Sequence, residues 1–354
     1  MRCGGFDETF VPDAMTEVSE LRQDPITGKW VVIAKGRAKR PQDFVRVGSP
    51  KLPPPPFLDT CPFCDFERFP QQSPTLVLPL GRAWKVRAFP NKFPAFSPGD
   101  RVNARKVGLY TVMDGVGFHE VIVPRAHNAL LARMARDDLS LFIRAWRVRY
   151  LDLMTKPPVA HIQLIENHGR ESGGSVEHPH LQLFAIPVIP SDEVLDLLRG
   201  AEAYYAENGS CAYCDILAFE HDAGTRIVWE NARFTVFCPF TSRVPNEQWV
   251  VPRSHNPGFE ALTDEDLPLF AEALQQALRR LDTGFGDPAY NLYVYSAPCD
   301  TEGYACAVDE FQHFHWHVQI LPRMNIWGGF ELATGLELHS VLPEEAAAFL
   351  REQS

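Results

Sequence analysis

Alternating hydrophobic and polar positions predict a chain of short strands that is interrupted by two long helices. Apolar residues recur three and four positions apart over 131–154 and over 264–281, which is the period of a helix with one buried face. The β-branched runs typical of strands lie at 29–35, 75–80, 85–90, 108–113, 119–124 and 160–168. Many strands with few long helices predict an α+β fold.

The same order of features occurs twice along the chain. The first copy reads CPFC at 61–64, HEVIVPRAHN at 119–128 and HPHLQLFAIP at 178–187; the second reads CAYC at 211–214, EQWVVPRSHN at 247–256 and HFHWHVQILP at 313–322. A duplicated unit predicts two histidine-triad-like halves, each an antiparallel sheet with packed helices, related by a pseudo-twofold axis. We expect an N-terminal half over 1–200 and a C-terminal half over 201–354, with the boundary near 190–208.

Composition and charge narrow the class of protein. A chain of 354 residues with 45% hydrophobic content suits two domains. Its net charge of -11 argues against nucleic acid as a partner, because binding to phosphate backbones needs a basic surface. The sequence contains no run of eighteen apolar residues, so we expect no membrane span. The first residues do not resemble a secretory leader, and we therefore expect a cytoplasmic protein. In that compartment, paired cysteines favour metal binding over disulfides.

Two sets of cysteines and histidines have the spacing of zinc ligands. Zinc takes four nitrogen or sulfur ligands, and a Cys-x-x-Cys supplies two of them from one turn. An isolated pair is also compatible with a buried turn or a redox pair, but a histidine follows each pair at the same relative place. The predicted ligands are Cys61, Cys64, His127 and His178 in the first half and Cys211, Cys214, His255 and His315 in the second. The other cysteines, Cys3, Cys238, Cys299 and Cys306, are predicted to be buried or incidental thiols.

The segment His178-Pro179-His180-Leu181-Gln182 carries the candidate chemistry. On a strand, alternate residues share a face, so a metal-bound His178 places His180 beside the metal but outside its coordination sphere. A neutral imidazole is a good nucleophile near pH 7 and can form a covalent bond to phosphorus. Gln182 offers an amide to a phosphate oxygen. The alternative for a lone His-x-His strand is a pair of half-buried histidines with no chemical role.

A Gly-rich turn precedes this segment. Gly173, Gly174 and Ser175 offer backbone N–H groups and a hydroxyl, which together suit an anion. Further candidate ligand contacts are Phe89 and Asn91 after a strand, Arg37 and Arg40 in a basic stretch, and Asn167 and Arg170 beside the turn. Each pair also has a purely structural interpretation. Phe89 and Asn91 would simply end a strand, Arg37 and Arg40 would lie on a solvated face, and Asn167 and Arg170 would cap the turn.

Together these motifs resemble the galactose-1-phosphate uridylyltransferase family, a branch of the histidine-triad superfamily. The similarity spans nearly the whole chain. It is carried by DPITGKWVVIAKGRAKRP (24–41), NHGRESGGSVEHPHLQ (167–182), HFHWHVQILPR (313–323) and GGFELATG (328–335). The His-Pro-His-x-Gln signature in this setting is specific.

The resemblance implies residue roles. In the family, the second His of His-Pro-His carries a covalent uridylyl group and the first is a zinc ligand, which implies His180 and His178 here. The resemblance also implies phosphate contacts by Gln182 and Ser175, a polar contact by Asn167, a nucleoside contact by Asn91 with Phe89, basic residues near the phosphates at Arg37 and Arg40, and a hexose contact at Glu331. His317, the repeat counterpart of His180, and the nearby Gln319 are expected to be relics or substrate contacts, because no Gly-rich turn precedes them.

The predicted reaction is ping-pong transfer of uridylyl from UDP-glucose to a hexose 1-phosphate, with structural zinc at both sites or iron at the second. Two residues depart from the pattern of the family that the chain resembles. Lys92 stands where well-studied members have an acidic residue, and Glu177 stands where an Asn is common. The complete second metal set resembles the branch with two-zinc members and ADP-glucose phosphorylases. The base of the nucleotide, uridine or adenine, therefore stays open. The acceptor, a sugar phosphate or inorganic phosphate, stays open as well. A non-catalytic zinc-stabilised nucleotide-binding protein is the other alternative. Family members are often dimers, which predicts a homodimer.

Overall fold

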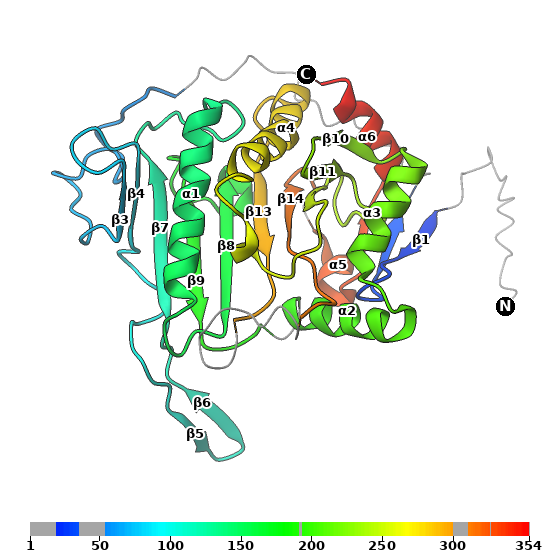
Figure 1. Ribbon diagram of the computed structural model, residues 1–354, viewed down its shortest axis with the longest axis horizontal. Coiled ribbons are helices and arrows are strands. Elements are labelled where there is room, and N and C mark those ends of the chain that lie inside the picture. Colours follow the sequence, from blue (N-terminus) through cyan, green and yellow to red (C-terminus); the bar gives the residue numbers. More distant parts are fainter. Residues whose placement is uncertain (1–18, 35–53, 191–192, 300–310, 326, 354) are drawn as a thin grey trace, which may run out of the picture.

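A ten-stranded sheet forms the body of the protein (Figure 1). The computed structural model describes residues 19–34, 54–190, 193–299, 311–325 and 327–353. The first-half strands, from the centre outward, are β8 (His161–His168), β9 (Leu181–Ile186), β7 (Phe118–Pro124), β4 (Val86–Pro90) and β3 (Leu76–Leu78). The second-half strands, in the same sense, are β13 (Tyr290–Tyr295), β14 (His317–Pro322), β12 (Gln248–Pro252), β11 (Phe234–Phe237) and β10 (Ile227–Glu230).

The strand order confirms the predicted α+β fold with two related halves. Repeat-equivalent strands occur in the same order on each side, and β8 and β13 pair antiparallel at the centre. This arrangement is the one that a twofold relation between the halves produces. The sheet runs without a break through this central pair. The division into residues 1–200 and 201–354 stays a prediction.

Two long helices cover one face of the sheet. The helix α1 (Arg136–Leu153) packs on first-half strands, and α4 (Leu267–Phe285) packs on second-half strands and against α1 (Figure 1). Leu181 and Leu183 of β9 point into this core, whereas the alternate residue Gln182 points to the other face. The helix-covered face is therefore the main hydrophobic core, and the opposite face carries the predicted chemistry.

The opposite face is covered differently in the two halves. In the second half, α2 (Val194–Asn208) and α3 (Ala212–Ala223) bury Phe237, Trp249 and Tyr295 in a second core. In the first half a small cluster built around Phe63 and Phe89 lies there, and its members come from strands and loops. No described helix covers this cluster, which leaves this part of the sheet as the place where a ligand can approach.

The remaining elements lie around the main sheet. A small sheet contains β1 (Glu20–Gln23), β2 (Trp30–Ile33) and β15 (Glu337–His339), so the described N-terminal strands pair with the C-terminal half. The hairpin of β5 (Ala104–Val107) and β6 (Tyr110–Met113) projects from the body (Figure 1). The other elements are the 3-10 helices Arg170–Ser172 and Phe259–Ala261 and the helices α5 (Gly329–Thr334) and α6 (Pro343–Arg351). No helix in the described residues is long and apolar enough to cross a membrane.

The strands around the two His-x-His motifs begin later than the pattern predicts. We expected strands over 178–187 and 313–322, but β9 begins at Leu181 and β14 at His317. Pro179 has no backbone N–H to donate to a neighbouring strand. In the second half, the Trp316 N–H donates to the Asn256 carbonyl of the preceding loop at 2.9 Å instead. The first His of each motif therefore lies in the approach to the strand.

Candidate active site and metal centres

The first Cys2His2 set converges on one point. The turn that contains Cys61 and Cys64 faces His178 and His127, and the four ligand atoms all lie within 4.8 Å of one another. The His178 Nδ1 lies 3.6 Å from the Cys61 Sγ and 3.5 Å from the Cys64 Sγ, which also lies 3.5 Å from the His127 Nδ1. The His178 Nε2 donates to the Pro124 carbonyl at 2.8 Å, and this bond directs Nδ1 toward the cysteines.

These distances fit a tetrahedral zinc ion. With Zn–S near 2.3 Å and Zn–N near 2.0 Å, tetrahedral angles separate sulfur and nitrogen by about 3.5 Å. Burial raises the pKa of Cys61 to about 11, so a cation is needed to hold this thiol as a thiolate near neutral pH. The residues present therefore suit zinc, which would fill its four positions with protein ligands and leave none for substrate.

The second set has the same geometry. The Cys214 Sγ lies 3.4 Å from the His255 Nδ1 and 3.6 Å from the His315 Nδ1. Cys211 begins α3 as its N-cap, and Cys214 lies in its first turn. Proximity to Cys211 raises the pKa of Cys214 well above its usual range, a cost that a bound cation removes. The two centres are thus built by equivalent residues in both halves.

His180 lies beside the first cluster and is not one of its ligands. Its Nδ1–H donates to the His178 carbonyl at 2.8 Å, so its Nε2 carries the lone pair. No described residue hydrogen-bonds to this Nε2, and the side chain is largely buried, with 8% of its surface exposed. Burial lowers the pKa of His180, which favours the neutral ring. The ring therefore presents a nucleophilic nitrogen.

Gln182 lies two residues after His180 on the same face of the sheet. Its orientation is fixed by His119, which the motifs in the sequence did not indicate. The Ala95 N–H donates to the His119 Nδ1 at 3.3 Å, which leaves the proton on Nε2. That Nε2 lies 3.0 Å from the Gln182 Oε1, so it donates to this oxygen and leaves the Gln182 NH2 for a ligand. The Asn91 Nδ2 lies 3.1 Å from the same His119 nitrogen; both atoms are donors, so Asn91 is a neighbour of this pair and not a hydrogen-bond partner in it.

The Gly-rich turn depends on its glycines. Gly173 has a φ of 86°, in the left-handed region. A Cβ on Gly174 would lie 2.8 Å from the Asn167 carbonyl oxygen and 2.7 Å from that of Gly169, so only glycine fits there. Ser175 is exposed after the turn, and the Asn167 side chain accepts a hydrogen bond from Asn291 of β13. The turn is thus closed on itself and held from the other half.

The second-half counterpart of this site is filled by aromatic side chains. His317 has no exposed surface and stacks between Trp249 at 4.9 Å and Tyr295 at 5.3 Å, measured between ring centroids. The strand register makes Val121 and Asn167 the first-half equivalents of these two aromatic residues. The bulk of Trp249 and Tyr295 therefore occupies the space that the first half leaves to a ligand.

The polar side-chain atoms of His317 and Gln319 also have hydrogen-bond partners within the protein. Gln319 donates to the His317 Nε2 at 3.1 Å and accepts from the Arg243 guanidinium at 3.0 Å. Burial lowers the pKa of His317 to about 3. The two residues that we expected to be relics or substrate contacts are therefore bound to protein groups, and we do not include them in the site.

The remaining predicted residues are dispersed. Phe89 is buried 5.8 Å from Phe63 between ring centroids, and Phe63 also lies 5.5 Å from the His180 ring. The Glu331 carboxylate accepts from the Gly328 N–H at 2.9 Å and so caps its own helix α5. Arg37 and Arg40 lie outside the described residues. Phe89, Asn91 and Asn167 thus join the His180 face, whereas the Glu331 side chain caps a helix.

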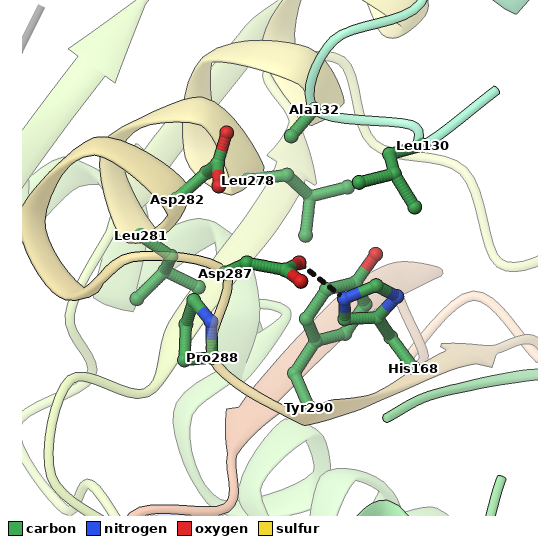
Figure 2. Close-up of a pocket in the computed structure, with 9 residues that line it drawn as sticks. All are labelled: Leu130, Ala132, His168, Leu278, Leu281, Asp282, Asp287, Pro288 and Tyr290. Atoms are coloured by element: carbon green, nitrogen blue, oxygen red, sulfur yellow. Dashed lines mark hydrogen bonds and ion pairs between the residues drawn. The ribbon is translucent and has the colours of Figure 1, made fainter. Parts of the chain in front are cut away.

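A small pocket on the helix-covered face is a different feature. Figure 2 shows it between the end of β8 and the end of α4, with the His168 Nε2 at 2.7 Å from the Asp287 Oδ1 and leucines opposite. The His168 ring stacks on Tyr290 at 4.9 Å. Because His168 and His180 point to opposite faces of the sheet, this pocket is not part of the candidate active site.

Comparisons with known proteins find relatives that match over nearly the whole chain. Residues 8–190, more than half of the chain, match the family model "Galactose-1-phosphate uridyl transferase, N-terminal domain". The chain is 29% identical to ADP-glucose phosphorylase of Arabidopsis thaliana over 347 residues, which cover 95% of this chain and 93% of that protein. It is 28% identical to galactose-1-phosphate uridylyltransferase of Thermotoga maritima, with coverage of 94% and 98%. The crystal structure of the Arabidopsis thaliana ADP-glucose phosphorylase with bound ADP-glucose superposes with a TM-score of 0.79 at 27% identity, with coverage of 96% and 99%.

The fold and the site define a duplicated α+β protein, with one His-x-His-x-Gln segment free of enclosing aromatic rings and one that such rings enclose. The chain belongs to the galactose-1-phosphate uridylyltransferase family, as its motifs predict. It is an enzyme of the nucleotidyltransferase and phosphorylase kind that this family contains.

Sequence reasoning missed His119 and Asn291. His119 had a usable signal: it opens the repeated strand segment, but its counterpart in the second copy is Glu247. A change of chemical type at a repeated position indicates that the two copies use it differently. Asn291 lies in the run YNLYVY of β13, which has no motif around it. Only the pairing of β13 with β8 reveals its contact with Asn167.

Proposed function

We propose that this enzyme transfers a nucleotidyl group from a nucleoside diphosphate hexose to a phosphate acceptor through a covalent bond to His180. The observation that carries this proposal is the His180 ring. Its Nδ1–H is held by the His178 carbonyl at 2.8 Å, while its Nε2 carries the lone pair and has no hydrogen-bond partner among the described residues. The first candidate reaction is uridylyl transfer from UDP-glucose to a hexose 1-phosphate, and it is supported by the likeness to the Thermotoga maritima protein named galactose-1-phosphate uridylyltransferase.

The chemistry follows from this nitrogen. The Nε2 lone pair attacks the α-phosphorus, a P–N bond forms, and the P–O bond to the sugar phosphate breaks with the electron pair going to the leaving phosphate. That group is a weak base and needs no proton. An acceptor phosphate oxygen then attacks the same phosphorus and returns the electron pair to Nε2. Gln182 and the amides of the Gly-rich turn donate to the phosphate oxygens as charge builds on them.

A second candidate is phosphorolysis of ADP-glucose by inorganic phosphate. It is favoured by the likeness to the ADP-glucose phosphorylase crystallised with ADP-glucose, which covers 96% of this chain. The two reactions share the first step and differ in the base and in the acceptor. Lys92 stands next to Asn91 at the predicted nucleoside contact, where the resemblance expects an acidic residue, and this departure also leaves adenine open.

We propose that zinc is structural at both centres. Four protein ligands at tetrahedral spacing leave no open coordination position. The first ion would hold the CPFC turn against His178 and so place His180, two residues later, in the site. Iron is the alternative metal at the second centre, and a cytoplasmic location and a homodimer are further parts of this proposal.

The test uses the metal-loaded protein and nucleotide-sugars labelled at the α-phosphorus. The wild type is expected to acquire acid-labile label on the peptide that contains His180, and His180→Asn is expected to remain unlabelled with metal content and melting temperature unchanged. Labelling of His180→Asn to the wild-type extent would overturn the mechanism. If the wild type is unlabelled by every nucleotide-sugar, a non-catalytic nucleotide-binding role is correct instead.

Product analysis then separates the two candidates. UDP-glucose and ADP-glucose are each incubated with galactose 1-phosphate or inorganic phosphate. UDP-galactose from the first sugar nucleotide supports uridylyl transfer. ADP from the second, formed only with inorganic phosphate, supports the phosphorylase.

A further inference from the structure

One residue of the C-terminal half, Asn291, contacts the proposed phosphate-binding part of the N-terminal half, and Arg323 contacts Asn291. Asn291 of β13 is directly opposite Asn167 of β8 in the strand register, at the centre of the sheet. It is buried, with 4% of its surface exposed. Arg323 follows β14, and its backbone N–H donates to the Ala289 carbonyl at 2.7 Å. Asn167 lies on the same sheet face as Gln182, because the register places Gln182 opposite Ile165.

The partners of Asn291 fix the direction of its amide. The Arg323 Nε can only donate, so it contacts the Asn291 Oδ1. The Ser172 carbonyl can only accept, so the Asn291 Nδ2 donates to it, at 2.9 Å. The second proton of that Nδ2 points at Asn167 at 2.6 Å, and the atom that receives it must be the Asn167 Oδ1. This assignment needs no assumption about which amide atom is nitrogen, since a guanidinium and a carbonyl decide it.

The Asn167 NH2 is therefore directed away from Asn291. No described residue accepts a hydrogen bond from it. Gln182 has the same polarity, because the His119 Nε2 occupies its oxygen. Both Gln182, a predicted phosphate contact, and Asn167, a predicted polar contact, thus have their acceptor ends taken by protein donors, and their donor ends remain for a ligand. A site that offers donors suits the oxygens of a diphosphate, which only accept.

We propose that Asn291 and Arg323 are positioning residues that orient Asn167 and hold the Gly-rich turn for the phosphates of the nucleotide-sugar. Arg323 holds Asn291, and Asn291 holds both the Asn167 amide and the Ser172 carbonyl of the turn. The proposal rests on the proposed function of His180. It also gives the C-terminal half a role in catalysis, although the counterpart of the nucleophile in that half, His317, is enclosed by aromatic rings.

The experiment measures the single-turnover rate constant for labelling of His180 at saturating nucleotide-sugar in full-length, metal-loaded protein. The variants are Asn291→Ala, Arg323→Met and Arg323→Lys, each made with Asn167 intact and in an Asn167→Ala background. With Asn167 intact, Asn291→Ala is expected to slow labelling roughly 10- to 100-fold, the range for loss of a residue that orients a ligand-binding group. Arg323→Met slows it less, and Arg323→Lys, which keeps a donor for Asn291, restores most of the rate.

The Asn167→Ala background separates orientation from structure. If Asn291 acts through Asn167, most of the slowing by Asn291→Ala disappears when Asn167 is already absent, and the remainder reports the contact with Ser172. A purely structural role predicts the same fold-loss in both backgrounds, and that result would overturn the proposal. So would a rate for Asn291→Ala equal to that of the wild type.

A matched control comes from the same half. Asn231 lies at the β10–β11 turn, donates to the Leu269 carbonyl at 2.9 Å and accepts from the N–H groups of Arg233 and Phe234. Asn231→Ala also removes amide contacts, and it is expected to change the melting temperature without changing the labelling rate. If the wild type fails to label, the proposed function fails. If the wild type labels and Asn291→Ala labels equally fast, only the positioning role fails.

Discussion

Glu166 makes the stability of this protein depend on pH in a direction opposite to that of most carboxylates. It lies on the helix-covered face of β8 with 2% of its surface exposed. Its Oε1 accepts from the Tyr290 hydroxyl at a long 3.4 Å, and its Oε2 is buried without a partner. Burial disfavours the charged form and raises the pKa of Glu166 from 4.5 to about 7.

The sign of the effect follows from this shift. The folded protein keeps the proton up to about pH 7, whereas the unfolded chain loses it above about pH 4.5. Stability is therefore fully present below pH 4.5 and falls as pH rises through the folded pKa. The interval of roughly 2.5 pH units, at about 1.36 kcal/mol per unit, corresponds to about 3 kcal/mol.

Glu166→Gln removes this dependence and keeps the shape of the side chain. Near pH 5 the variant is expected to have nearly the wild-type free energy of unfolding, and at pH 8 to be more stable by about 3 kcal/mol. Denaturant unfolding of both metal-loaded proteins in parallel at pH 5, 6, 7 and 8 measures the difference, in which the pH dependence of metal binding cancels. Glu207→Gln, at an exposed position of α2, is the control. A difference that does not change with pH, or a variant less stable at pH 8, refutes the reasoning.

Three further outcomes are expected at the metal centre and around the two His-x-His motifs. Cys61→Ser lowers bound zinc by about half and the free energy of unfolding by several kcal/mol; loss of activity with zinc and melting behaviour intact would contradict structural zinc. His119→Phe keeps the stack on Phe184 but removes the donor to Gln182, so labelling slows roughly 10- to 100-fold, and the added loss largely disappears in a Gln182→Ala background. His317→Gln still forms the labelled histidine, and peptide mapping that places label on His317 in the wild type would contradict the closed second site.

The sequence predicted those features of the fold and the site that depend on residues close together in the chain. The two Cys-x-x-Cys turns, the His-x-His-x-Gln segments and the Gly-rich turn are local, so their order alone predicted the duplicated fold, the family and two metal clusters. The helices around 131–154 and 264–281 also follow from local periodicity. The starts of β9 and β14 were placed too early, because the pattern of side chains does not report where backbone N–H groups find partners.

The domain division shows a different limit. A repeat indicates two similar units, but it does not say how their sheets meet. The antiparallel pairing of β8 with β13 makes one sheet of ten strands, and the pairing of β2 with β15 brings the described N-terminal strands to the C-terminal half. Such contacts join residues more than a hundred positions apart, so no local pattern encodes them.

The sequence by itself determined which side chains are available for chemistry: the thiols and imidazoles for two metal ions, and an imidazole with an amide for phosphate. Only the tertiary structure decided which copy of the motif is open. Trp249 and Tyr295 enclose His317, whereas the smaller Val121 and Asn167 occupy the equivalent positions beside His180, which keeps 8% of its surface exposed. The physical reason is that accessibility and amide orientation depend on neighbours from other strands, and cross-strand pairing exists only once the chain has folded.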